Sequence, residues 1–529
     1  MTRTHVTQTL LRVGLFAFII LQMTCVSAPV RIFAQPPLPL AAHWNLGEAA
    51  NGFGPEYQLK LISAGRHILP WIKMPGPELK ENDSLWTSYY QGPLRRFAEL
   101  KVPISLVGTQ WEARLTTDAH YFKLPADENP NVINLDGTPK PEVSAFGPAK
   151  HWRDVGRLWT TSPLFRKVIA AYREPPMVLL VSNNEHTREW WVKVEEDQHY
   201  LKRFGRGRSD DFKRKAVGDG WIELYRALQA GMREGLAGTP WEQRVIFVGY
   251  DAFGPPHFAR WPGWMEYSLY SQGRIDPKPL AWDGASPSFY VFNWNESTDY
   301  TVISPQVESM NWIFMLREAV RLNPKFWFEI STWDGHEPEM DNDKRKLYAR
   351  RGQQFTPERY GGMVQFGMWL LKPRVVREFR GWQDTLAQAE PFFKPILDAV
   401  DRVHASSVLG RFWRDGELVV NPEGRHPYQS NVPAEYRNEP RWFLLSTSVD
   451  PPKPWRLETP LPVFALALVA GQAPSREWLV YAHAPLGAQR GVSITLPGYG
   501  DVKADVSVGG SFIVISEKTR ESRPLLDAK

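Results

Sequence analysis

Apolar runs of strand length alternate with helix-length segments between residues 67 and 382, and this alternation limits the possible folds more than any other feature of the chain. The runs are rich in β-branched and aromatic residues and end at turn-forming residues, as buried strands do. They lie at 67–73, 102–111, 177–185, 244–251, 287–294, 326–335 and 374–380. Strands joined by helices pair in parallel through right-handed crossovers, so the pattern predicts an α/β fold.

Segments with helical spacing connect these runs. Apolar residues recur every three or four positions at 84–100, 162–172, 220–236, 307–322 and 356–372. A Gly-Pro pair at 92–93 breaks the first segment, and Thr356 begins the last one as a helix cap. An eighth strand, third in order, is expected within 113–160. Eight strands and long loops favour a (β/α)8 TIM barrel over a doubly wound sheet. No Gly-rich phosphate loop follows any strand, which argues against nucleotide binding.

The pattern changes after a helix predicted at 385–403. Short strand-like runs follow one another between Pro, Gly and Asp turns, with no helical segment among them; they lie at 417–420, 442–445, 463–468, 478–481, 492–496 and 512–515. Such a series is typical of a small antiparallel β-sandwich. We therefore expect a TIM-barrel catalytic domain over 35–408 and a β-sandwich accessory domain over 409–529.

The first 34 residues have the pattern of a secretory signal peptide. Arg3 and Arg12 precede an apolar run that is too short and too uneven to span a membrane. Cleavage after Ala28 and cleavage after Ala34 both remain open. Cys25 lies inside this segment, but the residues before it form a poor lipoprotein signal, so lipid anchoring is the less favoured outcome. The sequence predicts a secreted or periplasmic protein without a membrane span in its mature form.

Removal of the signal would change both the redox chemistry and the charge of the chain. Cys25 is the only cysteine, so the mature protein would have neither disulfides nor thiolate sites. The segment carries Arg3, Arg12 and Arg31 and no acidic residue, so its loss lowers the formal net charge from +5 to +2. A nearly neutral protein is a poor candidate for binding nucleic acid.

Two glutamates have positions that predict chemistry. Glu329 follows Phe326-Trp-Phe328, and we expect the strand to end there, which would leave a carboxylate against apolar walls. A buried carboxylate must be paired, hydrogen-bonded or shifted in pKa. Glu185 closes the run at 177–185 after Ser182, Asn183 and Asn184. Since the mouth of a parallel barrel gathers residues from distant strands, these carboxyls could face each other there.

These motifs resemble those of the clan A retaining glycoside hydrolases, and the β-galactosidase and agarase-like branches are the most similar. In that clan an Asn-Glu pair at the end of the fourth barrel strand supplies the acid/base, and a Glu at the end of the seventh supplies the nucleophile. The resemblance covers about residues 60–410, and an appended sandwich is also common in the clan. It implies that Glu185 is the acid/base, Glu329 the nucleophile, and Asn184 a ligand of the sugar 2-hydroxyl.

A second Asn-Glu pair, Asn295-Glu296, competes with Asn184-Glu185. It lies 33 residues before Glu329, which is one strand–helix unit. Its strand would therefore neighbour that of Glu329, whereas the clan places the acid/base three strands away. Spacing favours Glu185.

Further residues near strand ends are candidates for sugar binding. The 23 tryptophans of the chain either stack on sugar rings or build an aromatic-rich core, and composition does not separate the two. Tyr290 and Asn293 are alternatives for the tyrosine that the clan places beside its nucleophile. The other candidates, each with simple packing or a structural role as the alternative, are His67, Trp71, Gln110, Trp333 and Trp382.

Two charged segments have plainer explanations. Residues 202–215 are basic with interspersed acids, which indicates a solvated loop, with contact to an anionic polymer as the alternative. The acidic loop 336–343 lacks calcium-loop spacing, and the chain has no His-Glu-x-x-His motif, so we predict neither a metal nor a cofactor.

Together these patterns predict an exported retaining β-glycosidase that hydrolyses poly- or oligosaccharide. An anionic carbohydrate is the substrate in the alternative in which the basic segment 202–215 contacts it. The alternative is a non-catalytic carbohydrate-binding protein built on the same barrel. The sequence gives no signal about oligomeric state.

Overall fold

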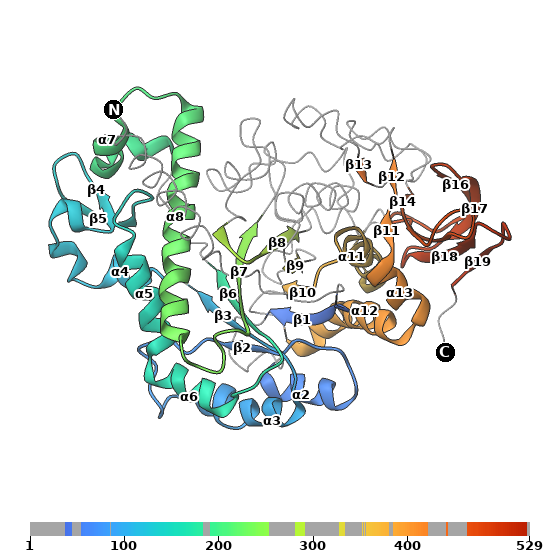
Figure 1. Cartoon of the computed structure of the whole chain (residues 1–529), viewed down its shortest axis with the longest axis horizontal. Coiled ribbons are helices and arrows are strands. Elements are labelled where there is room, and N and C mark those ends of the chain that lie inside the picture. The colour runs from blue at the N-terminus through green and yellow to red at the C-terminus, as the bar shows by residue number, and fades with distance from the viewer. Residues whose placement is uncertain are drawn as a thin grey trace, which may run out of the picture. The chain divides into compact units, whose positions relative to one another are not determined.

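An eight-stranded parallel sheet lies at the centre of the computed structural model (Figure 1). The structure describes residues 37–44, 54–84, 86–109, 111–183, 191–252, 281–290, 327–333, 352, 354, 356–379, 385–421, 441–442 and 463–525. The strands pair in the order β1-β10-β9-β8-β7-β6-β3-β2. Their bounds are β1 Leu40–Trp44, β2 Trp71–Lys73, β3 Ile104–Thr109, β6 Val178–Asn183, β7 Val245–Ala252, β8 Gly284–Tyr290, β9 Trp327–Trp333 and β10 Val375–Phe379.

The two outer strands in this order also contact each other. A parallel bridge joins Ala41 of β1 to Ile68, which lies just ahead of β2. The Leu69 amide donates to the Ala41 carbonyl at 2.9 Å, and the Ala41 amide donates to the His67 carbonyl at 3.0 Å. The sheet therefore curls until its first and second strands meet.

Two strand positions differ from the sequence prediction. The first strand is Leu40–Trp44, not 67–73, and the strand at 67–73 is the second. The region 113–160 contributes no strand to the central sheet but forms a separate antiparallel hairpin, β4 Asn131–Ile133 and β5 Pro139–Val143. The first strand escapes a local pattern search because it has only five residues, follows a proline-rich segment and pairs with β10, about 335 residues later. The ordinal positions of the later strands are unchanged, so β6 is the fourth and β9 the seventh.

Helices alternate with the strands of the sheet, and the proline and capping signals of the sequence set several of their starts. Thr356 accepts a hydrogen bond from the Arg359 amide at 3.2 Å at the start of α11, and Ser209 accepts one from the Phe212 amide at 3.3 Å at the start of α8. The helices are α2 Pro55–Ser63, η2 Trp86–Gln91, α3 Pro93–Leu100, α4 Ala113–Thr117, η3 Tyr121–Lys123, η4 Ala126–Glu128, α5 Lys150–Thr161, α6 Pro163–Ala171, η5 Trp191–Glu196, α7 Gln198–Phe204, α8 Asp210–Leu236, α11 Pro357–Leu371, α12 Leu386–Ala405 and α13 Ser407–Asp415. The break at 92–93 is confirmed, since η2 and α3 flank it.

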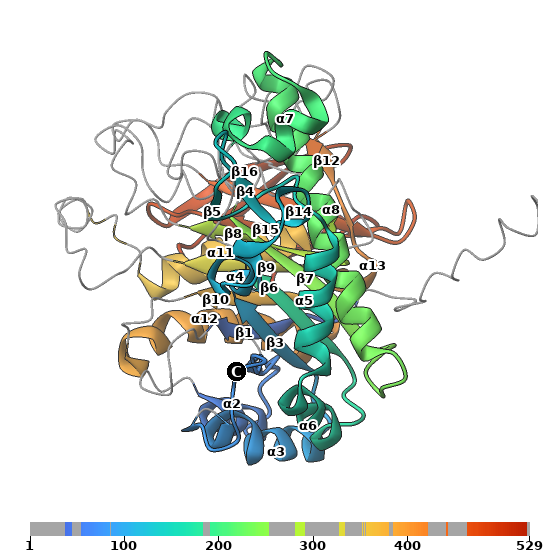
Figure 2. The same cartoon turned by 90° about the vertical axis from the view of Figure 1, so that its left-hand side faces the viewer.

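Helices α5 and α8 run side by side over one flank of the sheet (Figure 2). Their contact is close because glycines face backbone atoms of the opposite helix. A Cβ at Gly231 of α8 would lie 1.8 Å from the Arg153 carbonyl oxygen, and one at Gly156 of α5 would lie 2.1 Å from the Leu228 carbonyl oxygen. Edge-on contacts of Trp152 with the rings of α8 complete the seam.

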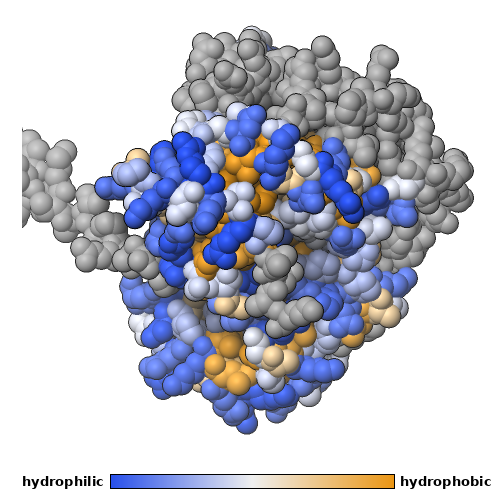
Figure 3. Space-filling view, turned by 90° about the vertical axis from the view of Figure 1, so that its right-hand side faces the viewer, coloured by the Kyte–Doolittle hydropathy of each residue, from blue (hydrophilic) through white to orange (hydrophobic). Residues whose placement is uncertain are grey.

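The C-terminal strands form a five-stranded sheet, ordered β11-β14-β15-β18-β19, and a hairpin of β16 and β17. One face of this sheet, with Trp478 and Val480, packs on the hairpin, and the other, with Leu466 and Tyr481, packs on α11 to α13. The side of the molecule that Figure 3 shows is mostly hydrophilic where residues are described, with apolar residues gathered in a few areas. The bounds are β11 Glu417–Leu418, β14 Phe464–Ala470, β15 Glu477–His483, β16 Gln489–Leu496, β17 Gly500–Val506, β18 Ser511–Ser516 and β19 Ser522–Pro524, and a separate pair is β12 Val420–Asn421 and β13 Arg441–Trp442.

The predicted domain boundary at 408–409 falls inside α13. A single hydrophobic core joins α11, α12 and α13 to one face of the five-stranded sheet, so the C-terminal sheet completes the packing of these helices. The two-domain division stays a prediction.

Candidate functional site

Seven of the ten sequence-predicted site residues come, in the sequence, at or soon after the end of a strand of the parallel sheet. Asn184 and Glu185 come directly after β6, which ends at Asn183, and Gln110 comes directly after β3. Tyr290 and Trp333 are the last residues of β8 and β9. Five of the predicted residues lie outside the described residues: Gln110, Asn184, Glu185, Asn293 and Trp382.

The sequence pattern predicts that the strand ends at Glu329, but the strand continues beyond it. Glu329 is the third residue of β9, which continues through Ile330 to Trp333. Across the sheet it pairs with Val375, which in turn pairs with Leu40, and both of these begin their strands. Ile330 and Thr332 are β-branched and Trp333 is aromatic, so the segment after Glu329 still favours a strand. The backbone of Glu329 is therefore nearer the amino end of the sheet than the carboxyl end.

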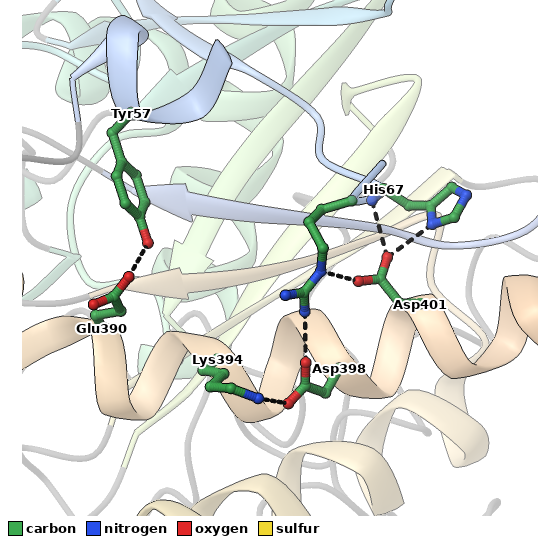
Figure 4. A network of polar contacts seen from close by, with 7 residues as sticks. Tyr57, His67, Glu390, Lys394, Asp398 and Asp401 are labelled. Carbon is green, nitrogen blue, oxygen red and sulfur yellow. Dashed lines mark hydrogen bonds and ion pairs between the residues drawn. The ribbon is translucent and has the colours of Figure 1, made fainter. Parts of the chain in front are cut away.

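His67 lies at the amino end of the sheet as well, four residues before β2 begins. Its amide and its ring Nδ1 both contact one carboxylate oxygen of Asp401 on α12, at 2.9 and 2.7 Å (Figure 4). Its ring stacks on His404 with centroids 3.6 Å apart. Burial lowers the pKa of His404 below its ordinary value. These contacts tie the loop before β2 to α12, on the side opposite to the carboxyl ends of the strands.

Trp71 is a core residue. It begins β2, is 2% exposed, and contacts Tyr89 edge-on. Its backbone amide donates to the side-chain oxygen of Gln58 at 2.6 Å, and the Gln58 amide donates back to the Trp71 carbonyl at 3.2 Å. Of the two explanations open for Trp71, the structure supports packing.

The same explanation holds for many of the described tryptophans. Several are almost fully buried, and two press on strands at glycines, since a Cβ at Gly108 or at Gly249 would lie 2.1 Å from the ring of Trp111 or Trp282. The deeply buried tryptophans are Trp71, Trp111, Trp152, Trp221, Trp241, Trp369, Trp413 and Trp478. Packing in the core thus accounts for these eight of the 23 tryptophans without a sugar ligand.

The long segment after β3, residues 111–149, forms the hairpin of β4 and β5 together with short helices and loops. Its hairpin and loops are joined to the segment after β6 by Asp197, which is fully buried. One Asp197 oxygen accepts from the Ile133 amide at 3.2 Å and from the His199 amide at 3.0 Å. The other accepts from the Ser144 hydroxyl at 2.5 Å. Asp197 therefore connects two loops that leave the carboxyl ends of neighbouring strands.

Two buried charged residues on β10 are not among the site residues predicted from the sequence. Glu378 is fully buried and lies 3.9 Å from His43 of β1, whose ring contacts Phe393 of α12 edge-on. Arg377, the preceding residue, is fully buried too, and its guanidinium donates to the Ser105 hydroxyl of β3 at 3.2 Å. The sequence does carry a signal for these two residues, because charged residues inside an apolar strand need buried partners.

The basic segment 202–215 is helical at both ends, where α7 ends and α8 begins, and only residues 205–209 between them form the predicted loop. Acidic residues pair with several of its charges: Lys202 with Asp127, Arg203 with Glu223, Lys213 with Glu195 and Lys215 with Asp219. These pairs favour a solvated helical surface over a contact for an anionic polymer.

Among the described residues, no group of three His, Cys, Asp or Glu side chains is arranged to hold a metal ion. None of the described helices is long and apolar enough to cross a membrane.

No protein-family model matches the chain, and no curated protein is similar to it in sequence. Among solved structures, the glycoside hydrolase domain of PgaB (BpsB) from Bordetella bronchiseptica is similar at a TM-score of 0.33 and 11% identity, over 63% of this chain and 98% of that one. A conserved exported protein from Bacteroides fragilis is similar at a TM-score of 0.33 and 9% identity, over 91% of this chain and 98% of that one. Scores this low leave fold and function to be argued from the chain itself.

Proposed function

We propose that the chain is an exported retaining β-glycosidase on a (β/α)8 barrel, acting on a poly- or oligosaccharide at the carboxyl ends of the strands. The observation that carries the proposal is the order of the sheet. Glu185 follows the fourth of eight parallel strands, and Glu329 lies on the seventh, three strands away. This is the relation that the resemblance to clan A implies for acid/base and nucleophile.

Barrel closure is supported by the register of the sheet. Leu40 pairs with Val375, which pairs with Glu329, and the paired position can be followed in this way from strand to strand across all seven pairings. With the register of each pairing held constant, the series ends at residue 75, just after β2. The bridge between Ala41 and Ile68 instead aligns Leu40 with residue 67. The displacement of eight residues between 75 and 67 equals the shear of an eight-stranded α/β barrel.

A contact through the interior supports closure independently. Arg377 of β10 and Ser105 of β3 are five strand steps apart in the pairing order, which is about 24 Å across a flat sheet. Their side chains are nevertheless 3.2 Å apart. This contact supports a rolled sheet in which β10 faces β3 across the interior.

The proposed chemistry is double displacement. A carboxylate attacks the anomeric carbon while the acid/base, Glu185, gives its proton to the leaving oxygen; Glu185 then deprotonates the water that breaks the glycosyl–enzyme bond. The two carboxyls must lie about 5–5.5 Å apart for this, with Asn184 hydrogen-bonded to the sugar 2-hydroxyl. In the sequence, the remaining predicted ligands come at or soon after the ends of strands, apart from His67 and Trp71.

The nucleophile has two candidates. The resemblance assigns this role to Glu329. Position along the strand favours Asp334, because it follows the end of β9 in the sequence as Glu185 follows the end of β6, whereas Glu329 precedes that end by four residues. Both candidates come from the seventh strand and its following loop.

Trapping the intermediate decides between them. A fluorinated mechanism-based glycoside should label the wild-type protein on Glu329 or on Asp334, as read by peptide mass spectrometry. Replacing the labelled residue by its amide should lower turnover about 1,000-fold and leave sugar affinity in place. Glu185→Gln should slow turnover of poor leaving groups more than of good ones.

The alternative, a non-catalytic carbohydrate-binding protein, gives a different result. It requires sugar affinity without turnover on any member of a broad β-glycan panel, and no covalent label. That outcome would end the enzyme hypothesis and leave the barrel intact.

A further inference from the structure

A cleft of about 490 Å³ lies where the hairpin of β16 and β17, the edge strand β19 and helix α12 come together. Its walls are formed by residues 503–505 of the hairpin, 510–513 at the start of β18, 522–525 on and after β19, and Arg402 of α12. Pockets of this volume hold small ligands, so the cleft has room for a ligand of the size of a sugar unit.

The walls of the cleft carry an excess of positive charge. Three of the lining side chains are cationic, Arg402, Lys503 and Arg523, and one is acidic, Asp505, which leaves a formal charge of +2. The Asp505 carboxylate accepts a hydrogen bond from the Gly491 amide at 2.8 Å. Among the described residues, no acidic side chain forms an ion pair with Lys503 or Arg523. This excess favours an anionic ligand, because carboxylates and sulfates accept charge-assisted hydrogen bonds from such cations.

Arg402 gives the cleft a cation at a set position. Its guanidinium lies over the ring of Phe512, 5.4 Å from the ring centroid. Phe512 is 3% exposed and belongs to the core that joins α11, α12 and α13 to the C-terminal sheet. Burial lowers the pKa of Arg402 below its ordinary value, but an arginine keeps its charge in a protein. Lys503 and Arg523 are exposed and can adjust their side chains around a ligand that Arg402 holds.

The edge strand beside the cleft is a poor site for a peptide. β19 has three residues and ends the strand order of its sheet, paired with β18. An extended peptide adds to such an edge through main-chain hydrogen bonds. Pro524 has no amide hydrogen to donate, and short edge strands with proline and charged residues block the addition of another strand. A small anion that binds through side chains is therefore favoured over a peptide strand.

A second cleft, of about 840 Å³, adjoins the first and shares Arg402 with it. It is lined by three acids and two cations, so its formal charge is −1. Two of these acids, Asp398 and Asp401, pair with Arg66. The larger cleft adds no positive charge, but it gives room for the uncharged part of a ligand that is longer than one unit.

We propose that the smaller cleft binds an acidic sugar unit of a longer carbohydrate, with its carboxylate or sulfate held by Arg402, Lys503 and Arg523. The next unit of the carbohydrate extends into the larger cleft. The preference for an anion stands on the cleft alone, and the choice of a sugar as its carrier rests on the proposed function. The substrate is then an anionic carbohydrate, and the C-terminal sheet contacts it in place of the segment 202–215, where acids pair with several of the charges.

Binding to the full chain tests the proposal by isothermal titration calorimetry. The probes are trimers of galacturonic acid, of mannuronic acid and of galactose 6-sulfate, with the neutral galactose trimer for comparison. Any trimer that the wild type cleaves is measured in the Glu185→Gln variant. Lys503→Gln combined with Arg523→Gln is the cleft variant, and its core stays intact because both side chains are exposed. We expect an acidic trimer to bind, its affinity to fall about tenfold in the cleft variant, and any affinity for the neutral trimer to stay the same.

Arg490→Gln combined with Lys518→Gln is the matched control. It removes the same charge from exposed positions of the C-terminal region that do not line the cleft. Because salt screens charges at a distance, this control should keep its affinity within about twofold at physiological ionic strength. Equal losses in the cleft and control variants, equal binding of acidic and neutral trimers, or no binding of any acidic trimer would overturn the proposal.

Turnover separates this proposal from the proposed function. Acidic-trimer binding that depends on the cleft, with no turnover of any glycan by the wild type, would sustain the anion site and defeat the glycosidase. Turnover without binding that depends on the cleft would do the reverse.

Discussion

Asp401 accepts two hydrogen bonds from the single residue His67, one from its backbone amide at 2.9 Å and one from its ring at 2.7 Å. Its second oxygen pairs with Arg66, and Arg66 also contacts Asp398 at 2.5 Å (Figure 4). The last turns of α12 are thereby fixed to the loop where the two outer strands of the sheet meet. A residue chosen from the sequence as a sugar ligand thus contributes to the base of the fold.

Replacing Asp401 should therefore cost stability and spare activity. Asp401→Asn removes a charge that meets Arg66 and His67 in a partly buried site, and we expect a loss of about 1–3 kcal/mol in the free energy of unfolding. Urea denaturation measures it. Lys394→Gln is the control, because its pair with Asp398 is an exposed contact one helical turn apart, worth about 0.5 kcal/mol or less. Equal effects of the two substitutions would contradict the anchoring role.

The seam of α5 and α8 predicts opposite effects for two glycines of one helix. A methyl group at Gly231 would lie 1.8 Å from the Arg153 carbonyl, a backbone atom that cannot swing aside, so Gly231→Ala should destabilise by about 3 kcal/mol. A methyl group at Gly218 would meet no heavy atom within 4 Å, so Gly218→Ala should stabilise by about 0.5–1 kcal/mol. Thermal unfolding of the two variants checks the signs. A stable Gly231→Ala protein would show that the helices are farther apart.

The packing of the segment after β3 should depend on one carboxylate, that of Asp197. Asp197→Ala leaves the donors of Ile133, Ser144 and His199 without their acceptor and should cost about 3 kcal/mol. Asp197→Asn keeps one oxygen and should cost less. Limited proteolysis should cut within 113–149 faster in the alanine variant. Glu196→Ala removes the neighbouring exposed acid and should leave the cleavage rate unchanged. A change as large as that of Asp197→Ala would contradict the role of Asp197 in holding this segment.

The sequence predicted the elements whose evidence is local. Helix starts at Thr356 and at the Gly-Pro break were found because capping and proline chemistry act within one turn. The first strand was missed because Leu40–Trp44 is defined by β10, far along the chain. β17 was also missed, although the alternation in Gly500–Val506 is regular, because only three of its seven residues are apolar and three are charged.

The candidate site shows the same limit. The apolar run at 177–185 correctly located β6, which is the fourth strand of the sheet in chain order; Glu185 follows it in the sequence and lies outside the described residues. The position of Glu329 along its strand was not predicted correctly. That position depends on the register of β9 with β10 and β1, which no single apolar run contains. Arg377 was overlooked for the same reason: its contact with Ser105 joins β10 to β3, which are distant in the strand order.

His483 makes the stability of the fold depend on pH. It is the last residue of β15 and is fully buried against α11, where a Cβ at Gly362 would meet its ring, and burial lowers its pKa from 6.5 to about 3. Between these values the unfolded chain binds a proton that the folded chain does not. Stability contributed by neutral His483 is therefore complete above pH 6.5 and falls by about 1.4 kcal/mol per pH unit as the pH drops towards 3.

Urea midpoints from pH 7 to pH 4 should fall less steeply in His483→Gln than in the wild type, whatever the stability of the variant at pH 7. The same substitution at the exposed His120 should leave the slope unchanged. Parallel slopes for all three proteins would mean that His483 is protonated in the folded state.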